Sequence, residues 1–127
     1  MIETYLIAYL LDKTAAGMNV YTEKPTEEVD NYILIEKTGS STSNRITTST
    51  IAIQSISNSL NGGSMLQAMS LNDEVKAAIL GEGEEYGLIE EDDIIEVELQ
   101  SDYNFTDTET KEYRYQAVFN VTHYQEA

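Results

Sequence analysis

The chain has 127 residues, of which 41% are hydrophobic and 24% charged, so it is long enough to bury a core and resembles globular proteins in composition. Its 23 acidic and 7 basic residues give a formal net charge of −16, which argues against binding to nucleic acid or to an anionic membrane. The absence of cysteine excludes disulfides, thiolate metal sites and cysteine nucleophiles. We expect a single soluble domain over residues 1–127.

The N-terminal segment has the apolar spacing of a helix. Ile2, Leu6 and Leu10 recur every four residues, which predicts a helix that ends near Gly17. The apolar run within it, residues 5–11, is too short to span a bilayer and follows an acidic residue, so we expect neither a membrane span nor a signal peptide. A short strand is expected next, at residues 18–21.

Two segments rich in β-branched residues flank a polar tip. Residues 32–37 and 46–56 predict an antiparallel pair of strands, joined by a flexible hairpin arm over about residues 38–50. The arm is either a segment that orders on a partner or a mobile surface loop. Its candidate partner-docking residues are Ser40, Ser41, Thr42, Ser43, Asn44 and Arg45.

A second helix is expected after the hairpin. Ser64 and Gln67 have the spacing of a capping box, and Gly81 marks the end of the helix. Ser70 followed by Asp73 would cap a shorter helix equally well.

Alternation marks the last two strands. Ile95, Val97 and Leu99 share one face of a strand over residues 94–100. A turn-rich segment leads from there to a strand over residues 113–124, whose odd-numbered residues face inward as far as Val121. The predicted order is helix-strand-strand-strand-helix-strand-strand. It implies an α+β fold with a mostly antiparallel sheet of about four to five strands and two helices packed on one face.

The sequence offers no catalytic constellation. His123 is the only histidine, and without a serine or cysteine motif it is best interpreted as a solvent-edge strand residue. The glycines between Gly81 and Gly87 have the wrong spacing for a phosphate-binding loop, and the acids between them would repel phosphate. We therefore expect no enzyme, no cofactor and no metal site.

Acidic residues concentrate in one segment. Nine of them and no basic residue lie between Glu82 and Glu98. Calcium binding, a catalytic carboxylate pair and a solvated acidic face are the possible interpretations. The calcium-loop spacing is missing, so the acidic face is favoured. The candidate residues for repelling DNA are Glu82, Glu84, Glu85, Glu90, Glu91, Asp92 and Asp93.

One motif resembles a known family. Tyr103-Asn104-Phe105, an Asp- and Thr-rich turn, and Arg114-Tyr115-Gln116 resemble the turn and last strand of the tail terminators of long-tailed bacteriophages, also called tail completion or minor capsid neck proteins. The resemblance extends over about residues 20–124. The chain departs from the family pattern in carrying Thr106 and Thr108 where prolines are frequent, and Lys111 where glycine is frequent.

The resemblance implies a structural role in the virion, with assembly in the host cytoplasm. Such a protein forms a homo-oligomeric ring, usually a hexamer, that caps the tail tube and ends polymerisation of the tail tube protein. It then joins the tail to the head connector or stopper protein. DNA would pass through the ring without being bound, and an acidic lumen would help it slide.

Scarce cations are the candidate contacts between copies. With 23 acids in each chain, neighbouring copies need positive groups to meet them. For each candidate the alternative is an ordinary ion pair within the chain. The candidates are Lys37, Arg45, Lys76 and Arg114.

Three other functions remain open at this point. The chain could be another head–tail joining protein, either a stopper or a head-completion protein. It could also be an acidic DNA mimic, which would need carboxylates spaced like phosphates over one convex face. An enzyme is a more distant alternative, and a pocket holding two carboxylates of raised pKa would mark it.

Overall fold

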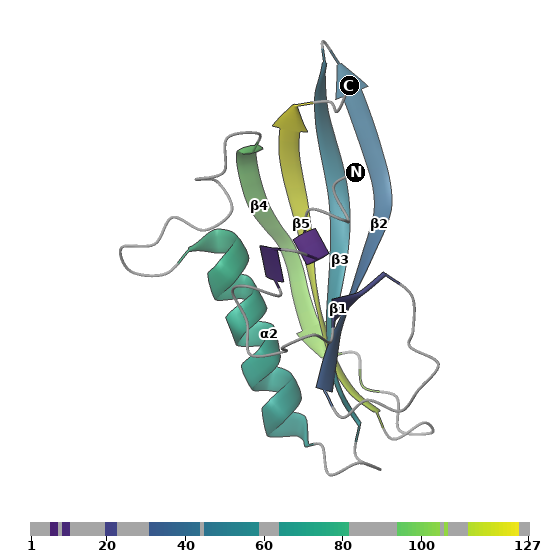
Figure 1. Ribbon diagram of the computed structural model, residues 1–127, viewed down its shortest axis with the longest axis vertical. Coiled ribbons are helices and arrows are strands. Elements are labelled where there is room, and N and C mark those ends of the chain that lie inside the picture. Colours follow the sequence, from purple (N-terminus) through teal and green to yellow (C-terminus); the bar gives the residue numbers. More distant parts are fainter. Residues whose placement is uncertain are drawn as a thin grey trace.

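Five strands form one mixed sheet, and helix α2 packs on one of its faces (Figure 1). The computed structural model describes residues 6–7, 9–10, 20–22, 31–43, 45–58, 64–81, 94–104, 106 and 112–124. The α+β class is thereby confirmed. The elements in chain order are β1 (Val20–Tyr21), β2 (Asn31–Ser43), β3 (Ile46–Asn58), α2 (Met65–Leu80), β4 (Ile94–Asn104) and β5 (Glu112–Tyr124).

The strands lie in the order β1-β2-β3-β5-β4. β1 runs parallel to β2, and every other neighbouring pair is antiparallel, so the sheet is mixed rather than purely antiparallel. In Figure 1 the β2–β3 hairpin extends above β4 and β5, whereas α2 lies beside the lower part of the sheet.

Part of the predicted N-terminal helix is described. Leu6, Ile7, Tyr9 and Leu10 are helical, and the two leucines are fully buried. The hydroxyl of Tyr9 donates a 2.6 Å hydrogen bond to the carbonyl of Ala78 near the end of α2. The ends of this helix lie outside the described residues.

The hairpin arm is a pair of strands as far as Ser43 and Ile46, beside the turn, rather than a loop. β2 continues past the predicted end at Lys37 to Ser43, with a register shift between Lys37 and Gly39. Ser43 pairs with Ile46, and Arg45 between them has φ 67°, the left-handed conformation typical of a tight hairpin turn. Thr38 and Thr42 favour this extension of β2, because threonine favours strand geometry.

The capping prediction at Ser64 is confirmed in part. Its side chain accepts a 3.2 Å hydrogen bond from the amide of Gln67, and α2 ends at Gly81, whose φ is 91°. The reciprocal bond of a capping box is replaced by a relay through Ser57 on β3. That hydroxyl accepts from the amide of Ser64 at 3.0 Å and donates to the side-chain carbonyl of Gln67 at 3.2 Å.

The predicted common face of Ile95, Val97 and Leu99 on β4 is wrong at its start. Register shifts between Ile94 and Glu96 and between Leu99 and Ser101 interrupt the alternation. Because an extra residue reverses the direction of the side chains beside it, Ile94 is buried and Ile95 is 38% exposed. The strand also runs further than predicted, through Tyr103 to Asn104.

The core lies between the sheet and its helical layer. On β5 the odd-numbered Ala117, Phe119 and Val121 are buried as predicted, facing Val75 and Ile79 of α2 in one cluster. The buried apolar residues of this cluster are Leu6, Leu10, Val20, Ile33, Ile35, Ile51, Ile53, Leu71, Val75, Ile79, Ile94, Ala117, Phe119 and Val121. Within the described part of the chain, no helix is long and apolar enough to cross a membrane.

Candidate functional site

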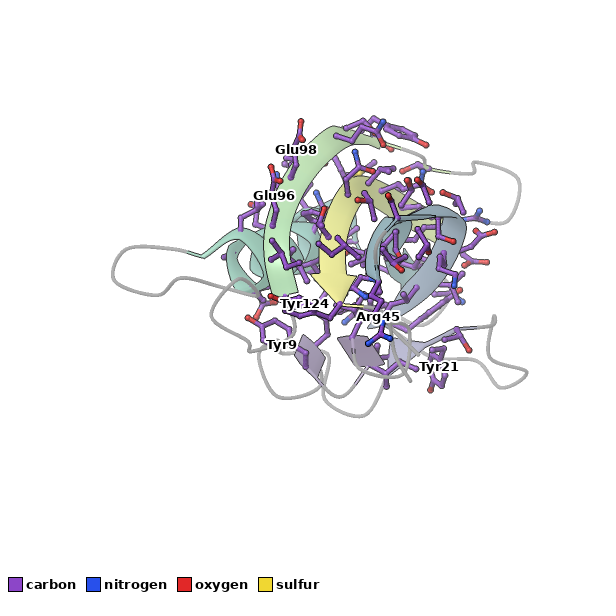
Figure 2. All side chains as sticks on the ribbon, turned by 90° about the horizontal axis from the view of Figure 1, so that it is seen from above. Tyr9, Tyr21, Arg45, Glu96, Glu98 and Tyr124 are labelled. Atoms are coloured by element: carbon purple, nitrogen blue, oxygen red, sulfur yellow. The ribbon has the colours of Figure 1, made fainter. Side chains whose placement is uncertain are left out.

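The sheet face turned away from α2 is polar along most of its length. Since side chains alternate along a strand, residues between the core positions of β3 and β5 point to this side. Figure 2 shows Glu96 and Glu98 pointing to one side of the molecule, and Tyr9, which contacts α2, lying on the other. We call this surface the polar face; its members are Thr48, Thr50, Gln54, Glu96, Glu98, Tyr103, Gln116, Asn120 and Thr122.

Hydrogen bonds run across the polar face between directly opposed residues. The hydroxyls of Thr48 and Thr122 lie 3.1 Å apart, and Thr50 donates to the side-chain oxygen of Asn120 at 3.0 Å. Further along, two glutamines are joined: Gln54 donates to Gln116 at 3.3 Å, and Gln116 in turn contacts the hydroxyl of Tyr103. These pairs fix the side chains against one another, and the buried Ala52 and Ile56 of β3 lie on the same side of the sheet.

The carboxylates of the polar face stand on its edge strand. Glu96 is opposite Thr122 and Glu98 is opposite Asn120, and both glutamates are exposed. Two negative charges on one side of a strand create a field that repels a polyanion. Of the nine acids between Glu82 and Glu98, only these two belong to the described residues; the seven predicted DNA-repelling acids lie outside them.

A buried ionic cluster lies at the end of the polar face, near the start of β5. The hydroxyl of Tyr32 donates a 2.8 Å hydrogen bond to Glu112 Oε2, and Arg114 Nη2 lies 3.9 Å from Glu112 Oε1. Burial raises the pKa of Tyr32 far above its ordinary value, and the hydrogen bond to Glu112 raises it further. Tyr32 also makes an edge-to-face contact with Tyr21 of β1.

Sequence reasoning did not identify this cluster. Glu112 falls in the predicted turn-rich segment, whereas in the structure it begins β5 and is only 5% exposed. The sequence did hold one signal for a Glu112–Arg114 pair. The two residues are two positions apart, and residues two apart in a strand lie on the same face.

The prediction for His123 is wrong. The ring is buried at 8% exposure, and Nδ1 lies 3.0 Å from the carbonyl of Tyr124, to which it can only donate. In the neutral ring Nε2 therefore accepts a hydrogen bond from Ser49, whose Oγ is 2.9 Å away. The serine is 1% exposed on the core side of the sheet, so no substrate can reach it. The pair satisfies two buried polar groups.

Lys76 and Arg114, two of the candidate cations, lie beside carboxylates of the same chain. Lys76 Nζ lies 2.6 Å from Asp102 Oδ2 and 3.4 Å from Asp73 Oδ1, and the hydrogen bond to Asp102 is the main cause of its raised pKa. Arg114 is held beside Glu112 as described above.

Arg45 stands on the hairpin arm, and Lys37 immediately precedes it. Lys37 is an exposed residue of β2, and Arg45 is exposed at the turn. Of the predicted docking residues, Ser40 to Ser43 are exposed members of β2, and the Thr42 hydroxyl lies 2.9 Å from that of Thr47. Asn44 lies outside the described residues.

Asp102 illustrates how α2 is attached to β4. Its carboxylate also accepts a 3.0 Å hydrogen bond from the side chain of Asn72. Burial alone would raise the pKa of Asp102, but the hydrogen bonds from Lys76 and Asn72 outweigh it and hold the pKa below its ordinary value.

Comparisons with known proteins give no further assignment. No protein-family model matches the chain, and no curated protein matches it. Among the described residues, no group of three or more histidines or carboxylates is placed to hold a metal ion. The polar face and the hairpin arm are the candidate site.

Proposed function

We propose that the chain is a tail terminator of a long-tailed bacteriophage, a structural protein that closes into a ring of copies, usually a hexamer. The ring would cap the tail tube, end polymerisation of the tube protein and present the surface that joins the head connector. Support comes from the residues that resemble this family, Tyr103 to Gln116, and from the character of the polar face.

The observation that carries the proposal is the pairing of a polar face with a helical face on one sheet. Glu96 and Glu98 project from the polar face, and the cross-strand rows beside them are neutral hydroxyls and amides. Arg114, the cation at one end of this side of the sheet, is held beside Glu112. A ring with this face inward would surround DNA with a surface whose carboxylates repel phosphate.

The predicted N-terminal helix belongs to the same proposal. Leu6 and Leu10 join the core cluster with Val75 and Ile79 of α2, and Tyr9 bonds to Ala78. We infer that the N-terminal segment packs beside α2 on one face of the sheet. Both helices would then lie on the outer wall of the ring, leaving the polar face free to line the lumen.

The direct test is electron microscopy of the purified protein mixed with tail tubes assembled from their tube protein. Tubes of fixed length with a ring at one end support the terminator role. Rings that bind only to isolated head connectors, with uncapped tubes of unlimited length, would instead assign the chain to another head–tail joining role. Protein that stays monomeric with every assembly component would overturn the proposal.

A further inference from the structure

The sheet has two free edges with different chemistry. β1 pairs only with Ile33 and Leu34, so within the described chain no strand pairs with the outer side of β2 from Ile35 to Ser43. β4 is the last strand at the other end of the sheet, and its described pairing is with β5 alone. Among the described residues, each edge therefore has a row of backbone amides and carbonyls with which no further strand of the sheet pairs.

The β2 edge is exposed and uncharged along its outer half. Residues 36–43 are all exposed, and from Thr38 to Ser43 the strand carries only glycine and hydroxyl side chains. At Gly39 an added Cβ would meet nothing within 4 Å, so the face of the sheet is open at this residue. Charged side chains usually protect an edge strand against the addition of another strand, and this part of β2 has none.

The β4 edge carries negative charge. Glu96 and Glu98 are exposed on it, and register shifts interrupt it twice. Two β4 edges brought together would place these carboxylates against one another, which is unfavourable. A β4 edge meeting a β2 edge instead places them against serine, threonine and glycine.

From these edges, and on the basis of the ring proposed above, we propose that the β2 edge of one copy pairs with the β4 edge of the next. Strand direction permits this. β2 to β3, β3 to β5 and β5 to β4 are all antiparallel steps, so β2 and β4 run in opposite directions. A neighbouring β4 added beside β2 from Ile35 to Ser43 therefore extends the sheet with a further antiparallel pair.

The registers identify which residues meet. Ser41 pairs with Thr48, Thr48 with Thr122, and Thr122 with Glu96, so these four form one row across the sheet. In the same way, Gly39 pairs with Thr50, Thr50 with Asn120 and Asn120 with Glu98. If neighbouring sheets continue at equal height, Ser41 of one copy lies beside Glu96 of the next. Its hydroxyl can then donate to that carboxylate.

This contact is head-to-tail and so can close a ring, whereas pairing of two like edges would stop at a dimer. It also keeps every polar face on the same side, because continuing a sheet preserves the alternation of its side chains. The acidic surface would then line one wall of the assembly without interruption.

Cysteine cross-linking tests the contact, since the natural chain has no cysteine. Ser41→Cys and Glu96→Cys chains are mixed under conditions that form rings and treated with a short bis-maleimide, which tolerates a small shift in register. We expect covalent dimers in the mixture and little product from either variant alone. Ser70→Cys, at an exposed position of α2, replaces Ser41→Cys in the matched control and should give no product with Glu96→Cys.

The outcomes separate this inference from the ring itself. Rings on tube ends without a Ser41–Glu96 cross-link overturn the edge contact and leave the terminator role standing. Cross-linked dimers from Ser41→Cys alone would show pairing of two β2 edges and would also overturn it. A specific cross-link in rings that do not cap tubes would support the contact and count against the terminator role.

A charge variant provides a second measurement that does not depend on cross-linking. Ser41→Glu places a carboxylate opposite Glu96 and should weaken association about tenfold, whereas adding Glu96→Lys to the same chain should restore it. Thermal melting checks that each variant is folded. Unchanged association of Ser41→Glu would contradict the proposed contact.

Discussion

Tyr32 and Glu112 are joined by a 2.8 Å hydrogen bond between two buried side chains that stand on different strands, β2 and β5, with β3 between them. A buried carboxylate is costly unless its oxygens have partners, and here the phenol supplies one partner and Arg114 lies near the other oxygen. The cluster therefore ties the start of β5 to the start of the hairpin.

Removing the phenol hydroxyl should destabilise the protein. Tyr32→Phe leaves Glu112 Oε2 without this donor in a buried site, so we expect the free energy of unfolding to fall by about 1–3 kcal/mol. Urea unfolding followed by circular dichroism measures the change. Tyr124→Phe is the matched control because Tyr124 is 54% exposed, and its effect should stay within about 0.5 kcal/mol.

The same tyrosine makes stability sensitive to alkaline pH. In the unfolded chain Tyr32 ionises near the ordinary tyrosine pKa of 10.0, whereas burial and the Glu112 hydrogen bond keep it protonated in the folded protein. The folded state then binds more protons than the unfolded state, so stability falls as pH rises above about 10. The fall between about pH 9 and 11 should be smaller in Tyr32→Phe. Parallel curves for the two proteins would contradict a raised pKa.

Lys76 and Asp102 give an effect at the opposite end of the pH scale. The pKa of Asp102 is lowered in the folded protein, so the pair stabilises above the ordinary aspartate pKa of about 4 and loses that contribution as pH falls through the lowered value. Because both side chains are partly exposed, Asp102→Asn should cost no more than about 1 kcal/mol at pH 7.

The difference between the natural chain and Asp102→Asn should shrink below about pH 4, which urea unfolding at several pH values would show. Asp73→Asn is the control. Asp73 is 73% exposed and lies 3.4 Å from the same lysine, so a smaller effect is expected. An equal effect of the two substitutions would mean that the bond between α2 and β4 contributes little.

Reversing charge on the polar face should create affinity for DNA. Glu96→Lys with Glu98→Lys replaces two repelling groups by two attracting ones on a surface already lined with hydrogen-bonding side chains. We expect fluorescence anisotropy to show weak, salt-sensitive binding to a short duplex that the natural chain does not bind. Asp73→Lys with Glu74→Lys on α2 makes the same change in net charge, and equal binding by this control would remove the special role of the polar face.

Local patterns predicted the strands and caps well. The odd-numbered core of β5, the N-cap at Ser64 and the end of α2 at Gly81 all follow from alternation or from side chains that bond to nearby backbone. These patterns depend only on residues close together in the sequence, so they can be recognised in a single sequence.

Non-local relationships could not be predicted in the same way. The register shift between Ile94 and Glu96 reverses the direction of the side chains at the start of β4, and the alternating sequence contains no pattern that predicts this shift. His123 is buried because β3 brings Ser49 beside it from 74 positions away in the chain. Glu112 is buried for the same kind of reason, through Tyr32. At the candidate site, the sequence identified an acidic segment but not the sheet face from which Glu96 and Glu98 project.

Association between copies should depend strongly on salt. Each chain carries a formal charge of −16, so approaching copies repel, and a Debye length of about 10 Å at 0.1 M salt leaves that repulsion partly unscreened. We expect monomers at low salt and a shift toward larger species as salt or a divalent cation is added.

Sedimentation velocity at several salt and protein concentrations measures this shift, with sucrose at matched osmolality as the control for general crowding. Screening acts on charge alone, so sucrose should not reproduce it. The Ser41→Lys variant separates edge contact from overall repulsion. One lysine per chain changes the net charge little, yet it stands in the row that ends at Glu96 and should favour association at low salt. Natural chains that remain monomers at every salt and protein concentration would show that screening does not release self-association.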